Sequence, residues 1–248
     1  MKRFFTGMLA LAVLASLSVV VQAQSLSRDE VLKDMAAKRA ELQQLEDQFL
    51  SPAAEDRAAY KEFLSQPDTG LIRLLPREVY ESEAYTKNRK TLTIRGGGAY
   101  YSFARLTHEY GYGSDLSLDS GYLSVGFAGA DYGMMIDLGD VSLEEISNDY
   151  PRVLSLLNYS PAKDLPQARV EQRQVQEGRI LDGATYKGRI PVKIGTTFLL
   201  RSINYDDTDV LVAFRPVRKD TDGSLIIAWK LLKKYPKPEL MRTAQAGN

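Results

Sequence analysis

Four segments in the last third of the chain are rich in apolar and β-branched residues, and they constrain the fold more than any other feature. This composition predicts β-strands over residues 184–194, 196–203, 209–219 and 224–232. In three of these segments apolar residues follow one another directly, at residues 198–200, 210–214 and 225–229. Because neighbouring side chains of a strand point to opposite faces, we expect both faces of this sheet to be covered.

Shorter strands are predicted upstream, where glycine, serine and aspartate separate short runs at residues 91–94, 99–106, 115–119, 122–126 and 132–138. Leu116 and Leu118, and then Leu123 and Val125, alternate with polar residues on the two sides of a turn at residues 119–121. This alternation is typical of a hairpin with one buried face. Gly223 ends an acidic loop that suits a tight turn between the last two strands, which should therefore pair antiparallel.

Helical signals dominate the region before these strands. Ser27 and Glu30 form a capping-box pattern, and an apolar stripe follows at helical spacing, at Val31, Met35, Leu42, Leu45 and Phe49. A second helix is expected after Ser51-Pro52. Lys38 interrupts the stripe, so packing against the rest of the protein is favoured over a coiled coil.

Further short helices are predicted around residues 142–176, from a second capping-box pattern at Ser142–Glu145 and from Asp164 before Leu165-Pro166. The expected organisation is a helical segment at 24–66, a connector at 67–90 and a β-rich domain at 91–248. The predicted fold class is α+β, with the N-terminal helical segment followed by a mainly antiparallel β-domain of roughly nine strands, as a sandwich or partly closed barrel.

Residues 1–23 have the pattern of a signal peptide. Lys2 and Arg3 precede an apolar run at residues 4–21, and residues 21–23 read Val-Gln-Ala, a small-x-small cleavage pattern. We therefore predict export to the periplasm or the medium; retention of the segment as an anchor is the alternative. The chain has no cysteine, so neither a disulfide nor a cysteine-linked lipid is expected.

Charge and motifs exclude several classes of partner. Without Lys2 and Arg3 the chain carries 30 basic and 32 acidic residues, a balance that disfavours nucleic acid and anionic membranes as partners. Phosphate loops and dinucleotide fingerprints are absent from the sequence, and we expect no cofactor. The motifs are too generic to indicate a family, and nothing in the sequence indicates the oligomeric state.

The segment 96–132 is the best candidate for a ligand-binding surface, because it holds six of the 14 tyrosines of the chain. Aromatic rings beside flexible glycine backbone can stack on sugar rings while their hydroxyls form hydrogen bonds. Ordinary sheet composition explains the same pattern. The predicted ligand-binding residues are Tyr100, Tyr101, His108, Tyr110 and Tyr112.

Catalytic and metal-binding motifs are incomplete. His108 is the only histidine of the chain and could act as a general base, although no partner is indicated for it. The acidic loops at 206–209 and 220–223 could bind calcium only if they meet, and the second does not fit an EF-hand. We therefore predict no catalytic residue and no metal ligand.

These observations favour an exported, non-catalytic binding or envelope-associated protein, whose partner is a glycan or another exported protein. A metal-independent hydrolase acting outside the cytoplasm is one alternative. The other is a structural protein whose N-terminal helices mediate oligomerisation.

Overall fold

The computed structural model describes residues 27–79, 98–108 and 111–241. The predicted signal peptide, the predicted strand at 91–94 and Tyr110 lie outside these ranges. The chain divides into two units, residues 1–41 and residues 42–248. No helix among the described residues has the length and apolar character that crossing a membrane requires.

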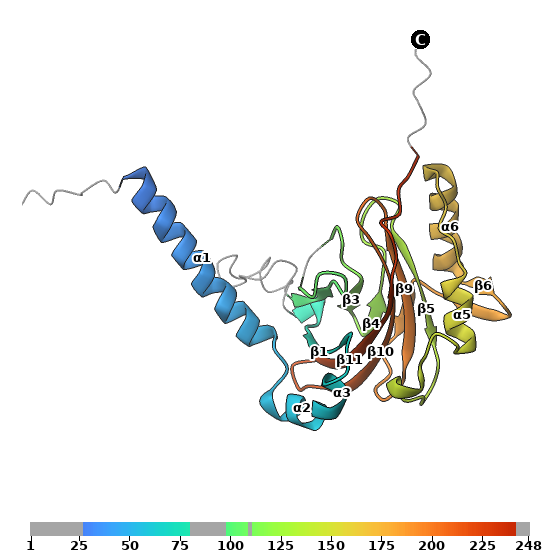
Figure 1. Cartoon of the computed structure of the whole chain (residues 1–248), viewed down its shortest axis with the longest axis horizontal. Coiled ribbons are helices and arrows are strands. Elements are labelled where there is room, and N and C mark those ends of the chain that lie inside the picture. The colour runs from blue at the N-terminus through green and yellow to red at the C-terminus, as the bar shows by residue number, and fades with distance from the viewer. Residues whose placement is uncertain (1–26, 80–97, 109–110, 242–248) are drawn as a thin grey trace, which may run out of the picture. The chain divides into compact units, whose positions relative to one another are not determined.

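The larger unit is built around a five-stranded antiparallel sheet with the strand order β1-β11-β10-β9-β5 (Figure 1). Its strands are β1 (Thr69–Leu74), β5 (Tyr132–Asp137), β9 (Phe198–Asn204), β10 (Thr208–Lys219) and β11 (Leu225–Lys234). Strands β9, β10 and β11 confirm the strands predicted at residues 196–203, 209–219 and 224–232. Gly223 has a φ of 88° in the turn between β10 and β11, and these two strands pair antiparallel as predicted.

A second, four-stranded sheet has the order β2-β3-β4-β8. Its strands are β2 (Tyr100–Tyr101), β3 (Leu116–Asp119), β4 (Tyr122–Ser124) and β8 (Arg189–Pro191). The predicted hairpin is confirmed, because Leu118 lies opposite Leu123 across the β3–β4 turn. The single strand predicted at 184–194 is divided into β7 (Ala184–Tyr186), which pairs with β6 (Arg179–Leu181), and β8, which pairs with β4.

Both faces of the five-stranded sheet are covered, as the unbroken apolar runs predict. In β10, Leu211 and Ala213 face one hydrophobic core, and Val212 and Phe214 face the other. The first core is closed by helices α5 (Pro151–Leu157) and α6 (Leu165–Glu177), and the second by the four-stranded sheet. The fold is therefore α+β with a sandwich-like arrangement, as predicted.

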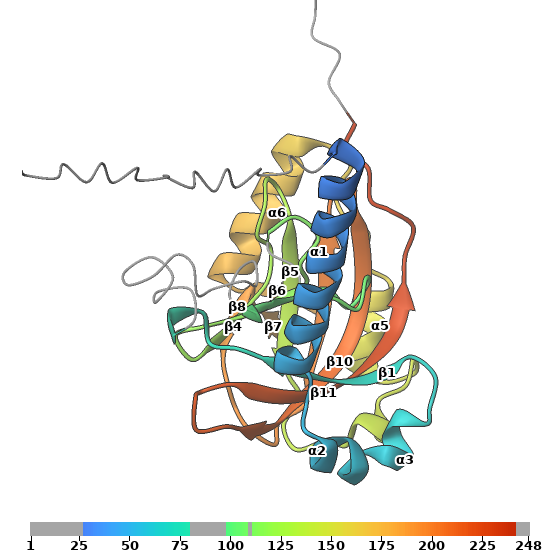
Figure 2. The ribbon, with the colours of Figure 1, turned by 90° about the vertical axis from the view of Figure 1, so that its left-hand side faces the viewer.

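Strand β1 occupies part of the segment predicted as a connector. It pairs along its whole length with β11, from Thr69 opposite Lys230 to Leu74 opposite Leu225 (Figure 2). Leu71 contributes to the first core, whereas Ile72 contributes to the second. A short strand that is buried on both faces has no alternating pattern, so its sequence resembles an apolar patch in a loop.

Helix α1 (Arg28–Leu50) begins at the predicted capping box, with the Ser27 amide donating to Glu30 Oε2 at 2.8 Å and the Glu30 amide to Ser27 Oγ at 3.3 Å. The side chains of its apolar stripe are exposed, from 37% at Leu42 to 56% at Leu45. Two short helices follow, α2 (Ala54–Ala59) and α3 (Lys61–Leu64). At the start of α2 the Asp56 carboxylate accepts the amide of the N-cap residue Ala53 at 3.2 Å.

Two more helix starts follow the predicted pattern. Asp164 caps α6, because its carboxylate accepts the Gln167 amide at 2.9 Å. Ser142 caps the short 3-10 helix η2 (Leu143–Glu145) by accepting the Glu144 amide at 3.3 Å. The cap partner is therefore Glu144 and not the expected Glu145, because a 3-10 turn brings the second residue closer than an α-helical turn does.

Candidate ligand pocket

The two neighbouring tyrosines predicted to bind a ligand are core residues. Tyr100 and Tyr101 are each 5% exposed. The Tyr100 ring lies edge-on to Phe127, with 5.2 Å between centroids, and the Tyr101 ring lies edge-on to Phe103 at the same separation. Neither ring is free to stack on a ligand.

His108 joins the second core to strand β1. Its Nε2 donates to the Arg73 carbonyl at 2.8 Å, and its ring lies edge-on to Tyr101. Burial lowers the pKa of His108 below its ordinary value, so the ring is neutral at physiological pH. Strand β1 lies at the edge of the five-stranded sheet, and this hydrogen bond gives its Arg73 carbonyl a donor.

Tyr112 is the exposed member of the predicted set, with 55% of its surface accessible. Its hydroxyl donates to the Tyr205 carbonyl at 2.9 Å. Tyr205 directly follows β9, whereas the anchor of His108 is in β1, three places away in the strand order of the sheet. The described members of the predicted set therefore do not gather at one site.

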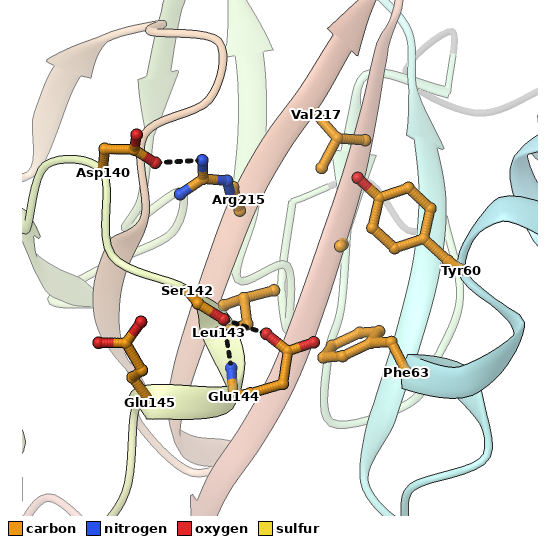
Figure 3. Close-up of a pocket in the computed structure, with 10 residues that line it drawn as sticks. Tyr60, Phe63, Asp140, Ser142, Leu143, Glu144, Glu145, Arg215 and Val217 are labelled. Carbon is orange, nitrogen blue, oxygen red and sulfur yellow. Dashed lines mark hydrogen bonds and ion pairs between the residues drawn. The ribbon is translucent and has the colours of Figure 1, made fainter.

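A pocket of about 400 Å³ lies elsewhere on the larger unit, and we call it the Arg215 pocket. It is bounded by the α2–α3 pair on one side and by the segment leading into η2 on the other, with β10 and β11 between them (Figure 3). Its lining residues are Tyr60, Phe63, Asp140, Ser142, Leu143, Glu144, Glu145, Arg215, Val217 and Ala228.

An aromatic wall forms the α2–α3 side of the Arg215 pocket. Tyr60 lies at the junction of the two helices, half-buried, with its ring edge-on to Phe63 at 6.5 Å. Arg218 of β10 binds the Asp56 carboxylate with two nitrogens and so holds α2 against the sheet. Both rings face the pocket, with Phe63 beside Glu144 and Tyr60 beside Val217 (Figure 3), and Tyr60 is the more exposed of the two.

The opposite wall is polar. Arg215 Nη2 lies 2.5 Å from Asp140 Oδ1, and its Nη1 donates to the Val141 carbonyl at 3.0 Å and to Thr197 Oγ1 at 3.2 Å. Glu144 and Glu145 also line the pocket; the Glu144 carboxylate points toward Phe63, whereas the Glu145 carboxylate points away from it (Figure 3). The guanidinium is thus held by two residues of the loop after β5 and by Thr197, just before β9.

Glu144 is a carboxylate of this pocket whose pKa lies below its ordinary value. The Ser142 hydroxyl donates to Glu144 Oε2, and this hydrogen bond lowers the pKa of Glu144, with smaller contributions from Lys230 and Arg215. The carboxylate therefore remains ionised in mildly acidic solution and is a weak base. The pocket can accept hydrogen bonds and attract a cation over a wide pH range.

The two acidic loops considered for calcium do not meet. They lie at opposite ends of β10, whose 12 residues span roughly 35 Å. Asp207 pairs with Arg105 in the first loop, and Asp222 pairs with Arg73 in the second. Within the described ranges, histidine and acidic residues form no group of three that could hold a metal ion.

Comparison with known proteins provides no relative for this chain. No protein-family model matches it, and neither does any curated protein or solved structure.

The Arg215 pocket could not be found from the sequence. Its residues come from three distant segments, around residues 60, 142 and 215. Each segment has a local explanation: Tyr60 belongs to the apolar side of a helix, Ser142 to a cap and Arg215 to a strand. Only the register of β10 against its neighbours and the position of α2–α3 bring them together.

Proposed function

We propose that the protein is an exported, non-catalytic binding protein whose ligand is a glycan held in the Arg215 pocket. One observation carries the proposal: the Tyr60 ring faces carboxylate and guanidinium groups across a floor that contains Val217 and Ala228. A sugar ring has an apolar face that stacks on aromatic rings and a rim of hydroxyls that need acceptors and donors.

The size and chemistry of the pocket support this assignment. Its volume of about 400 Å³ falls within the usual range for small-ligand sites. Asp140, Glu144 and Glu145 supply acceptors for sugar hydroxyls, and Arg215 supplies donors at a fixed position. Fixed polar groups lower the entropic cost of binding.

Binding is favoured over hydrolysis because the candidate nucleophile, general acid and general base do not suit those roles. The Ser142 hydroxyl donates to Glu144 and caps η2. Glu144 has a lowered pKa, which suits an ionised acceptor better than a general acid. His108 bonds to the Arg73 carbonyl and is not among the residues that line the pocket.

Export is part of the proposal and rests on the pattern of residues 1–23. The test is fractionation of cells that express the full chain, followed by N-terminal sequencing of the exported product. We expect a new N-terminus at Gln24. A product that begins at Met1 in the cytoplasmic fraction would contradict it.

The binding assignment is tested by calorimetric titration of the purified protein with soluble oligosaccharides. We expect Tyr60→Ala to lower affinity by about tenfold or more, because the stacking ring is lost. Tyr112→Ala is the matched control, since Tyr112 is an exposed tyrosine of the segment 96–132. Loss of binding in Tyr112→Ala but not in Tyr60→Ala would instead assign the ligand to that segment.

A further inference from the structure

The walls of the Arg215 pocket carry an unbalanced charge. Asp140, Glu144 and Glu145 are acidic, and Arg215 is the basic residue among those that line it. Arg215 Nη2 is paired with Asp140, and its Nη1 donates to the Val141 carbonyl and to Thr197. Two carboxylates, Glu144 and Glu145, are therefore not neutralised by the guanidinium.

The nearest additional cation is committed to the protein. Lys230 contributes to the lowered pKa of Glu144, but its Nζ donates to the Ile146 carbonyl at 3.1 Å, and Lys230 does not line the pocket. The Ser142 hydroxyl gives Glu144 a single hydrogen bond, which leaves its carboxylate with further acceptor positions. A ligand with a positive group therefore meets open acceptors of the opposite charge.

We propose that the glycan bound in the Arg215 pocket is an amino sugar with a free, protonated amino group, such as a glucosamine unit, whose ring stacks on Tyr60 and whose ammonium group binds Glu144. This inference rests on the proposed function and narrows it to one class of glycan. An N-acetylated sugar has the same ring face but presents a neutral amide, so it gains the stacking contact without the ionic one. A simple alkylamine has the charge without the ring.

The test compares matched ligands by titration calorimetry at low ionic strength and mildly acidic pH, where the amine is protonated and Glu144 remains ionised. The probes are the β-1,4-linked glucosamine trimer, its fully N-acetylated counterpart and n-hexylamine. We expect the glucosamine trimer to bind about threefold more tightly than the acetylated trimer, since one partly exposed charge pair is added. The preference should shrink as salt is added.

Substitutions test which carboxylate causes the preference for the free amine. Glu144→Gln keeps the shape of the side chain but removes its charge, so it should abolish the preference for the free amine. Glu145→Gln should leave the preference unchanged, because the Glu145 carboxylate points away from Glu144 (Figure 3). Glu177→Gln is the matched control, because Glu177 is an exposed residue at the end of α6 that does not line this pocket. All three variants alter exposed side chains and should keep the wild-type melting temperature.

Each outcome decides the question. Equal affinity for the two trimers, or a preference that survives Glu144→Gln, would overturn the amino-sugar inference and leave the proposed glycan site in place. Equally tight binding of hexylamine would also overturn the inference, because the ring would then be irrelevant. No binding of these trimers or of any other oligosaccharide would defeat the proposed function itself.

Discussion

Asp115 and Asp131 are both buried carboxylates, and they differ in how many donors they meet. Asp115 accepts the Phe103 amide at 2.7 Å, the Asn204 side-chain amide at 3.0 Å and further bonds from Ser102 and Ala104. Asp131 is 3% exposed and accepts the Tyr205 amide through Oδ1, but its Oδ2 has no hydrogen-bond partner. Asp115 therefore holds several segments together through its hydrogen bonds. Asp131 carries a charge that too few donors stabilise when it is ionised.

Asp131 should make the protein less stable as pH rises. Burial raises the pKa of Asp131 to about 7, with added repulsion from Asp207 and Asp206. The folded state therefore holds this proton more tightly than the unfolded chain, whose ordinary value is 3.8, and stability is lost between about pH 4 and pH 7. Asp115, with a pKa raised to about 6, contributes in the same direction over the lower part of that range.

The prediction is that Asp131→Asn increases the free energy of unfolding at pH 8 by about 2 kcal/mol and removes the decline between pH 6 and pH 7. Urea denaturation at pH 5 and pH 8 measures both effects. A variant that is as pH-dependent as the wild type would show that another group titrates in this range.

Asp115→Asn should have the opposite effect. In either orientation its new amide nitrogen would face a donor, either the Asn204 side-chain amide or the Phe103 and Ala104 backbone amides, which leaves at least one buried donor without an acceptor. We expect a loss of about 2–3 kcal/mol at pH 8, measured in the same urea titrations. A neutral or stabilising result would indicate that the carboxyl is protonated in the native protein.

At the scale of elements, strand β1 is held at the edge of the main sheet by close packing. Gly70 lies opposite Trp229 in the β1–β11 register, and a Cβ atom at this position would lie 2.4 Å from Trp229 Cε2. The indole ring therefore covers the backbone of β1, and only glycine allows this approach.

We predict that Gly70→Ala destabilises the protein by about 2 kcal/mol, because the indole or the strand must move. Gly188→Ala is the control: its new Cβ would lie 3.5 Å from Val175 Cγ1, an ordinary contact. Thermal denaturation of both variants should show a lower melting temperature for the first alone. Equal melting temperatures would mean that the Trp229 ring moves freely.

Elements were predictable where one local signal was sufficient. The cap at Asp164 placed the start of α6, and Gly223 placed the turn between β10 and β11, since both depend on residues close in sequence. Strand β1 was missed because its only partner, β11, lies more than 150 residues away. Tyr100 and Tyr101 were misleading for a related reason, since a strand tyrosine has the same sequence whether it faces a core or a ligand.

At the scale of the whole molecule, one buried arginine joins several layers. Arg201 of β9 forms a two-nitrogen ion pair with Asp209 of β10 and donates to the Leu156 and Tyr159 carbonyls at the end of α5. Its guanidinium also lies 3.8 Å from the centroid of the Tyr235 ring. The sheet, a helix and the C-terminal segment therefore share one charged centre.

Arg201→Met should lower the free energy of unfolding by about 3–5 kcal/mol, because Asp209 is left as a buried, unpaired charge. The double variant Arg201→Met with Asp209→Leu should recover part of this loss. Urea denaturation of both variants provides the comparison. If the double variant is no more stable than the single one, the carbonyl contacts rather than the ion pair dominate.

The residues that form both hydrophobic cores lie in the unit 42–248, so this unit contains the packing that stabilises the fold. Removal of residues 1–41 should therefore change the melting temperature by no more than about 2 °C. Light scattering of the same truncated protein tests the structural alternative. An unchanged oligomeric mass would argue against oligomerisation through the N-terminal helix.

The sequence alone determined the α+β class, the antiparallel C-terminal strands and the covering of both faces of the main sheet. These properties follow from the spacing of apolar residues and from turn chemistry, which act over a few residues. The tertiary structure alone decided which aromatic rings are buried and where a pocket forms. Tyr60, Arg215 and the residues near Ser142 meet only because strand register and helix packing place distant segments at one surface, and such long-range pairing leaves no local pattern in the chain.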